Sequence, residues 1–217
     1  MFVIVFANGE FVPPADLNKL LVAADLLVAA DGGARYLETL GRAPDILIGD
    51  FDSLPIEIAN SLGRKEVQIH KHPSSKEQTD LELALEHALR AGATEIVVLA
   101  GLGLRWDHSL ANLFLTAHPK YVGVQIQFVH GEQRVHIFHG DNELKASKGE
   151  QVSLIPISGD VRGVSTRNLL YPLNRETLYF GSSRGVSNIV VEEGAEVSIE
   201  SGVLLCIVSP AENGGSE

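Results

Sequence analysis

Short apolar runs alternate with helix-like segments through the first 130 residues of the chain. Between residues 80 and 91, apolar side chains recur with the 3.6-residue period of a helix. Alternation of strands and helices favours an α/β fold with a mainly parallel sheet and helices on both faces. The apolar runs predict strands at residues 2–6, 26–30, 46–49, 66–70, 95–99 and 122–129. The segments between them predict helices near residues 14–23, 33–41, 54–62, 80–91 and 107–117.

The pattern changes after about residue 130. Short alternating runs, such as residues 151–155 and 196–199, are separated by Gly, Asn, Pro and Ser, and no helical period is evident. This pattern predicts an all-β antiparallel sandwich or small barrel. We therefore expect an α/β domain over residues 1–130, an all-β domain over residues 131–211 and a disordered tail over residues 212–217.

Composition narrows the class of protein. A hydrophobic content of 45% with 21% charged residues is typical of a soluble globular protein. The net charge of −11, without a basic stripe, argues against a nucleic-acid partner. The only cysteine, Cys206, excludes an internal disulfide, and its apolar neighbours predict a buried thiol. The chain starts without a signal-peptide pattern and has no membrane-length apolar stretch, so we expect a cytoplasmic location and no membrane partner.

The most informative segment is Gly49-Asp50-Phe51-Asp52-Ser53, which directly follows a predicted strand. Continued strand alternation would send Asp50 and Asp52 to one side and Phe51 to the other. Two neighbouring carboxylates repel each other unless a cation lies between them, and Mg²⁺ prefers such oxygen ligands. The segment therefore predicts a Mg²⁺ site, although a polar turn in which Ser53 caps a short helix is an alternative.

Three further segments are rich in acidic, basic or glycine residues: 31–33 after the second strand, 76–80 before the clearest helix, and 101–108 after the fifth strand. Because the carboxyl ends of parallel strands share one edge of a sheet, we expect these loops to converge on a ligand site. Arg105, close to two glycines, suits bidentate binding of phosphate.

Each of these segments also has a structural interpretation. Asp31 with two glycines could form only a tight turn. Thr79-Asp80-Leu81-Glu82 matches a capping box, in which Thr79 caps the helix and Asp80 favours its dipole. The same helix N-terminus would also attract phosphate. Asp107 could likewise be an N-cap.

Several other chemistries are excluded by pattern. The chain has no P-loop motif, and Gly101-Leu102-Gly103 lacks the third glycine of a dinucleotide fingerprint. Residues 181–185 match Gly-x-Ser-x-Gly. A serine hydrolase with this motif requires a histidine later in the chain, and none follows residue 185. The pairs His70/His72 and His136/His139 lack supporting ligands, so we expect them at the surface rather than at a metal.

Taken in order, these motifs resemble those of the thiamine pyrophosphokinase family. The family pattern also includes a Gly-Leu-Lys-Tyr/Trp-x-Leu stretch and a late Ser-Asn pair. The resemblance covers nearly the whole chain. The matching segments are Asp31–Gly33, Gly49–Ser53, Lys76–Asp80, Gly103–His108, Asn168–Leu173 and Ser187-Asn188.

The resemblance implies an enzyme that transfers a diphosphoryl group from Mg-ATP to the hydroxyl of thiamine, leaving AMP. It also implies a homodimer, in which the β domain of the partner subunit helps to bind thiamine at the subunit interface. A related diphosphotransferase acting on a hydroxymethyl pterin is one alternative. A non-catalytic nucleotide-binding module is another, but a mere binder need not keep so many like charges together.

Roles for individual residues follow from the same resemblance. Asp50, Asp52 and Asp80 would hold Mg²⁺, and one aspartate would accept the proton of the thiamine hydroxyl. Arg105 and Lys76 would offset phosphate charge, helped by contacts of ATP with four further residues: Gly32, Ser53, Thr79 and His108. Asp31 would position the metal or nucleotide, and Asp107 would orient Arg105 or the substrate. The expected thiamine contacts are Tyr171, Ser187 and Asn188.

Three positions depart from the family pattern. Glu77 replaces an aspartate, which keeps the charge but lengthens the side chain. Leu104 replaces a glycine beside Arg105, which predicts an ordinary backbone angle there. Asn168-Leu169-Leu170 replaces Gly-Leu-Lys: Asn168 tolerates the left-handed conformation, but Leu170 removes a positive charge.

Overall fold

The computed structural model describes residues 1–51, 67–75 and 77–211. The helix expected at 54–62 and the tail at 212–217 lie outside these ranges. The chain forms two compact units, one of residues 1–115 and 126–131, the other of residues 116–125 and 132–217. None of the helices in the described ranges is long and apolar enough to span a membrane.

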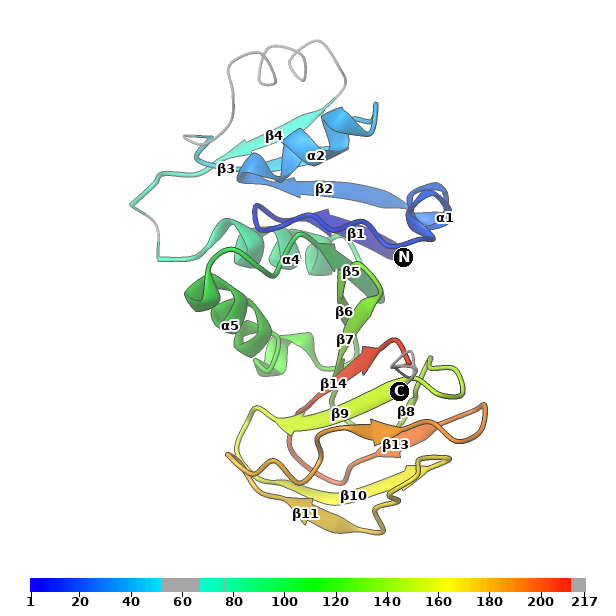
Figure 1. Cartoon of the computed structure of the whole chain (residues 1–217). Helices are drawn as coiled ribbons and strands as arrows, with labels where there is room; N and C mark the ends of the chain where they lie inside the picture. The colour runs from blue at the N-terminus through cyan, green and yellow to red at the C-terminus, as the bar shows by residue number, and fades with distance from the viewer. Residues whose placement is uncertain (52–66, 76, 212–217) are drawn as a thin grey trace. The chain divides into compact units, whose positions relative to one another are not determined.

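The first unit contains a sheet with the strand order β6-β5-β1-β2-β3-β4, which Figure 1 shows from the side. The pairs β5–β1, β1–β2, β2–β3 and β3–β4 are all parallel. Their carboxyl ends therefore share one edge of the sheet. The strands are β1 (Phe2–Phe6), β2 (Leu26–Ala30), β3 (Ile46–Gly49), β4 (Gln68–Lys71), β5 (Glu95–Leu99) and β6 (Gln125–His130).

Helices cover both faces of this sheet. Alternate residues of β1, such as Ile4 and Phe6, share a core with Leu17, Leu21 and Leu37. These leucines come from α1 (Leu17–Ala23) and α2 (Ala34–Thr39), which follows a 3-10 turn, η1 (Asp31–Gly33). The other buried residues of β1 face the opposite side, where α4 (Asp80–Arg90) packs against β1, β2 and β3. Between β5 and β6 the chain also forms α5 (Trp106–Leu115) and, in residues that belong to the second unit, the 3-10 turn η2 (Pro119–Tyr121).

Sequence-local chemistry explains where α4 begins. The Thr79 hydroxyl accepts a hydrogen bond from the backbone N–H of Glu82 at 3.1 Å, as the capping-box pattern predicts. Leu81, Leu85 and Ala88 form its buried stripe. The helix is thereby fixed with its N-terminus at the carboxyl edge of the sheet, where Thr79 and Asp80 line a pocket.

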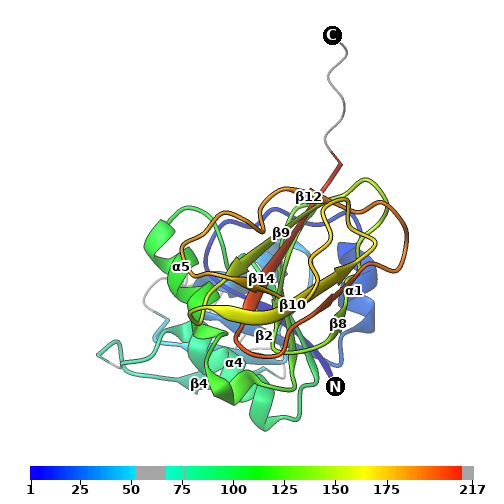
Figure 2. The ribbon, with the colours of Figure 1, turned by 90° about the horizontal axis from the view of Figure 1, so that it is seen from below.

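The second unit is a sandwich of two antiparallel sheets. One has the strand order β12-β9-β14-β7 and the other β11-β10-β13-β8. In Figure 2, β10 lies over β9 and β14 of the other sheet. A single hydrophobic core contains residues of both sheets, including Leu154, Val164, Val197 and Cys206. The strands are β7 (Gln133–Phe138), β8 (Asn142–Glu143), β9 (Gln151–Pro156), β10 (Val161–Arg167), β11 (Glu176–Leu178), β12 (Asn188–Ile189), β13 (Glu196–Ser198) and β14 (Leu204–Ser209).

The fold class predicted from the sequence is confirmed, with small shifts at element ends. The first helix starts at Leu17 rather than residue 14, and its start follows a turn in which Leu17 N–H bonds the Pro14 carbonyl. The strand expected from residue 122 starts at Gln125, because Gly123 with φ 87° completes a turn. Cys206 is fully buried, as expected.

One expectation at the end of β3 is wrong. The strand ends at Gly49, and Phe51 has a φ of 67°, so strand alternation does not continue through this residue. Phe51 turns back to pack against the core that contains α1 and α2. Asp52 lies outside the described residues.

Candidate active site

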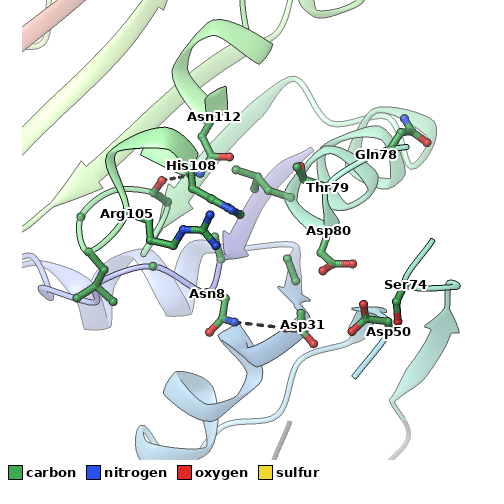
Figure 3. Close-up of a pocket in the computed structure, with 17 residues that line it drawn as sticks. Asn8, Asp31, Asp50, Ser74, Gln78, Thr79, Asp80, Arg105, His108 and Asn112 are labelled. Atoms are coloured by element: carbon green, nitrogen blue, oxygen red, sulfur yellow. Dashed lines mark hydrogen bonds between the residues drawn. The ribbon is translucent and has the colours of Figure 1, made fainter. Parts of the chain in front are cut away.

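A pocket of about 400 Å³ opens at the carboxyl edge of the parallel sheet, a size that suits a small-molecule ligand. Figure 3 shows Arg105 and His108 on one side of it, and the carboxylates of Asp31, Asp50 and Asp80 on the other. Loops that follow β1, β2, β3 and β5 and the start of α4 all contribute to its wall. The lining residues are Ala7, Asn8, Gly9, Ala30, Asp31, Asp50, Ser74, Gln78, Thr79, Asp80, Leu81, Gly101, Gly103, Leu104, Arg105, His108 and Asn112.

Asp31 occupies a special backbone position directly after β2. It is 7% exposed and has a φ of 48°, which a residue with a side chain adopts only with support from its surroundings. Asn8 Nδ2 donates a hydrogen bond to Asp31 Oδ2 at 3.3 Å. A Cβ on Gly49 would lie 3.1 Å from the Asp31 Cα, so the glycine at the end of β3 leaves room for this turn. Asp31 is therefore held in place and faces the pocket.

Asp31, Asp50 and Asp80 supply the donor chemistry that a hard divalent cation requires. They come from the ends of β2 and β3 and the first turn of α4. Within residues 1–51, 67–75 and 77–211, however, no three His, Cys, Asp or Glu side chains are close enough together to form a complete metal site. Asp52 and the predicted phosphate contacts Ser53 and Lys76 lie outside the described residues. Asp31, Asp50 and Asp80 could therefore contribute some of the oxygen ligands of a divalent cation, with oxygens of a bound phosphate as further ligands.

Arg105 and Asp107 form a two-pronged ion pair. Arg105 Nε donates to Asp107 Oδ1 at 3.1 Å, and Arg105 Nη2 donates to Asp107 Oδ2 at 2.5 Å. The guanidinium holds the pKa of Asp107 below its ordinary value, mainly through these hydrogen bonds, and Asp107 raises the pKa of Arg105. Both side chains are mostly exposed, so the pair orients the guanidinium rather than stabilising the fold.

The backbone of the loop that carries Arg105 differs from our expectation. Leu104 has a φ of 58° rather than an ordinary angle, and Gly103 has a φ of 83°. The chain thus keeps the left-handed turn although a leucine stands where the family pattern has glycine. At the other departure, Asn168 has a φ of 59°, so the prediction that asparagine tolerates the glycine conformation is confirmed.

Of the predicted phosphate contacts, Thr79 lines the pocket and Gly32 does not. Thr79 lines the pocket and also caps α4, so both interpretations of this residue agree with the structure. Gly32 lies behind Asn8: a Cβ there would come within 2.4 Å of Asn8 Oδ1. The glycine thus provides space for the Asn8 side chain instead of lining the pocket.

The sequence reasoning missed four polar residues of the pocket wall: Asn8, Ser74, Gln78 and Asn112. Asn8 could have been found, because it follows the apolar run 2–6 as Asp31 follows the next strand. Asn112 lies on α5, is 8% exposed and donates to the Gly101 carbonyl at 2.7 Å. A polar residue at a buried helical position was its only signal. Gln78 lies within the segment 76–80 that the sequence singles out, whereas Ser74 carries no recognisable pattern.

The β unit has its own cavity of about 290 Å³. Among the predicted thiamine contacts, Tyr171 and Asn188 line it, and Ser187 is adjacent in the chain. Asn188 is 8% exposed, accepts from Tyr171 N–H at 3.0 Å and donates to the Tyr171 carbonyl at 2.8 Å. Asn188 therefore shapes the segment that carries Tyr171, a residue that is 65% exposed.

The expectation that His136 and His139 lie at the surface is wrong. In each side chain Nε2 is buried and has no hydrogen-bond partner among the residues that the structure describes. His136 is the cross-strand neighbour of Cys206 and faces the same core. Burial, with smaller effects of Arg134 and Lys145, lowers the pKa of His136 to about 4. His70 is exposed, as expected, and its ring lies 4.9 Å from that of His87.

Comparison with known families matches both parts of the chain. Residues 17–128 match the family model described as the catalytic domain of thiamin pyrophosphokinase, and residues 135–204 match the model of its vitamin B1 binding domain. A thiamine pyrophosphokinase of Bacillus subtilis is 27% identical over 196 residues, covering 89% of this chain and 92% of that protein.

Solved structures agree over nearly the full length. The crystal structure of thiamine pyrophosphokinase from Bacillus subtilis has a TM-score of 0.84 at 26% identity and covers 96% of this chain and 99% of its own. The thiamin pyrophosphokinase from Geobacillus thermodenitrificans has a TM-score of 0.82 at 26% identity, covering 98% of this chain and 99% of its own.

Proposed function

Because the chain belongs to the thiamine pyrophosphokinase family, we propose that it transfers the diphosphoryl group of ATP to the hydroxyl of thiamine, giving thiamine diphosphate and AMP. The single observation that carries this proposal is the match of both family models, in order, over residues 17–128 and 135–204. The pocket at the sheet edge supports it, because it brings four segments that are distant in sequence to one site.

In the proposed reaction, the thiamine hydroxyl oxygen attacks the β-phosphorus of ATP. A bond forms between these atoms, the bond between the β-phosphorus and the α,β-bridging oxygen breaks, and AMP leaves. The hydroxyl proton passes to a carboxylate of the pocket. The protein has little covalent chemistry to perform, so positioning and charge compensation account for most of the rate.

Mg²⁺ is the cation we propose for this site, with Asp50, Asp52 and Asp80 as its protein ligands. When bound, it would offset the negative charge of the phosphates. Asp31, buried and bonded to Asn8, would orient the metal or the nucleotide from the next strand. The three carboxylates that line one pocket support a cation there, since carboxylate oxygens are the ligands that Mg²⁺ prefers.

On the opposite wall, Arg105 would bind the transferring phosphates, with Asp107 fixing the orientation of its guanidinium. His108 and Thr79 line the same pocket and would contact phosphate oxygens. Lys76 and Ser53 are further proposed contacts of the ATP phosphates, and their support is the family pattern alone. Asn8 is an additional residue of the pocket, held by its bond to Asp31.

Thiamine would bind at the cavity of the β unit, where the exposed ring of Tyr171 can stack on an aromatic heterocycle. The positive charge of thiamine also suits a chain with a net charge of −11. A homodimer, in which this cavity serves the active site of the partner subunit, is part of the proposal, as is a cytoplasmic location.

The test is incubation of the purified protein with ATP, Mg²⁺ and thiamine, followed by separation of the nucleotides and thiamine esters. Formation of AMP and thiamine diphosphate in equal amounts would support the proposal. AMP formation only with a hydroxymethyl pterin, or ATP binding without turnover, would overturn it. Molar mass in solution, measured by light scattering, tests the dimer separately.

A further inference from the structure

The loop between β5 and α5 contains a leucine in a backbone conformation that leucine disfavours. Leu104 has a φ of 58° and follows Gly103 with a φ of 83°. For an L-residue with a β-carbon, this conformation brings Cβ close to the carbonyl oxygen and costs energy. The Leu104 side chain is 74% exposed, so burial of its own surface compensates little of this cost. Other contacts must hold the turn.

A backbone hydrogen bond from Arg105 N–H to the Gly103 carbonyl at 2.6 Å closes the turn, and Ser109, in the first turns of α5, adds the side-chain contacts. Its hydroxyl accepts a hydrogen bond from Gly103 N–H at 3.1 Å and donates one to the Arg105 carbonyl at 2.9 Å. A hydroxyl can donate once and accept twice, so both bonds can exist together. Ser109 N–H also donates to the Arg105 carbonyl at 3.0 Å. One buried side chain, 6% exposed, thus ties together the residues on either side of Leu104.

The turn decides where the Arg105 side chain starts. Arg105 lines the pocket, although its side chain is mostly exposed, so packing restrains it little. The backbone at this position therefore restrains the direction of the side chain, together with the two hydrogen bonds to Asp107. Nearby, Asn112 anchors the beginning of the same loop through the Gly101 carbonyl.

We propose that Ser109 is a positioning residue: its hydroxyl holds the left-handed turn that directs Arg105 into the pocket, and thereby permits leucine at position 104. The proposal rests on the proposed function only in assigning Arg105 to the phosphates of ATP. The conformational part concerns the turn itself and is measurable without turnover.

The experiment compares Ser109→Ala, Leu104→Gly and the double variant in steady-state kinetics. Ser109→Ala should raise the KM for ATP about tenfold, because the turn relaxes and no longer holds the Arg105 guanidinium in position. The KM for thiamine should change little. The double variant should recover most of this loss, since glycine adopts the left-handed conformation without side-chain cost. Thr39→Ala is the matched control: its hydroxyl also donates to the carbonyl four residues earlier, at 2.9 Å, but outside the pocket wall, and its kinetics should equal wild type.

Two results would overturn the proposal. One is a double variant as impaired as Ser109→Ala alone, which would indicate a general structural role. The other is an equal effect of Ser109→Ala on the KM for ATP in an Arg105→Ala background, because a residue that acts through Arg105 should lose its effect there.

Hydrogen exchange of the Gly103 amide separates this proposal from the proposed function. The amide should exchange faster in Ser109→Ala, because its acceptor is gone. Unchanged exchange would overturn the positioning role even if the enzyme is active. Faster exchange in a protein that does not convert ATP and thiamine would support the held turn and would reject the activity alone.

Discussion

Asn188 and Tyr171 are joined by two hydrogen bonds between the carboxamide of one and the backbone of the other. Asn188 is buried, whereas the ring of Tyr171 is exposed at the cavity of the β unit. Asn188, which we expected to contact thiamine, thus uses its carboxamide to hydrogen-bond the backbone of Tyr171. Loss of the Asn188 carboxamide should therefore affect the position of Tyr171.

Asn188→Ala should raise the KM for thiamine roughly tenfold and leave the KM for ATP nearly unchanged, because it leaves two backbone groups of Tyr171 without their partner. The unfolding free energy should fall by about 1–3 kcal/mol. Asn188→Asp, which keeps the acceptor but loses the donor, should fall between Ala and wild type. Asn142→Ala is the control, since that amide bonds the Gly140 carbonyl outside this cavity. An unchanged KM for thiamine in Asn188→Ala would contradict this prediction.

Asp80→Asn should lower turnover roughly a hundredfold or more and raise the Mg²⁺ concentration that gives half-maximal rate, because a carboxylate ligand is lost. Asp52→Asn should nearly abolish turnover and leave the fold intact. Glu82→Gln is the matched control for Asp80: it lies in the same turn of α4 but outside the pocket wall, and should retain wild-type metal dependence. Chelation by EDTA should stop the wild-type reaction, and added Mg²⁺ should restore it. A wild-type rate for Asp80→Asn would remove this residue from the metal site.

Arg105→Lys should lower kcat/KM for ATP roughly tenfold or more, because an ammonium group cannot reproduce the two-pronged geometry of the guanidinium. Asp107→Asn should have a smaller effect of the same kind, since Arg105 keeps its charge but loses its ion pair. The control is Arg90→Lys, an exposed arginine on α4 that pairs with Glu86. Equal kinetics of Arg105→Lys and Arg90→Lys would exclude a special role for the guanidinium.

Acid should destabilise the β unit through His136. The pKa of His136 is about 4 in the folded state, whereas the ordinary pKa of histidine is 6.5, so the unfolded chain binds a proton more readily. The stability contribution is complete above pH 6.5 and is lost as the pH falls toward 4. The full linkage amounts to about 3 kcal/mol. Arg134 and Lys145, the charged groups near His136, act in the same direction as burial.

The measurement is chemical denaturation at several pH values between 4 and 7. His136→Leu should flatten the pH dependence in this range, whereas His118→Gln, at an exposed position, should leave it unchanged. An unaltered slope in His136→Leu would show that another group causes the acid sensitivity.

The buried strands of the parallel sheet and the clearest helix could be predicted because they depend on local pattern. Strands β1, β2, β3 and β5 have the predicted bounds, and α4 begins at its Thr79 cap. The strand-end rule correctly brought Asp31, Asp50, Asp80 and Arg105 to one pocket. Each of these inferences uses residues that are close in sequence and a general property of parallel sheets.

Other features depended on contacts between distant residues. The left-handed Leu104 could not be inferred, because its support comes from Ser109 across the loop. Burial of His136 was missed because its neighbour Cys206 is 70 residues away in sequence, on the adjacent strand β14. Asn188 was predicted as a ligand contact, but only the folded chain shows its bonds to Tyr171.

The sequence by itself determined the strand–helix alternation, the family resemblance and the set of charged residues, because periodicity, caps and short motifs are local. Tertiary structure decided which polar side chains face a cavity, which support the backbone and which lie in a core. Hydrogen-bond geometry and burial depend on segments that meet only after folding, and the same asparagine or histidine has a different role in each setting.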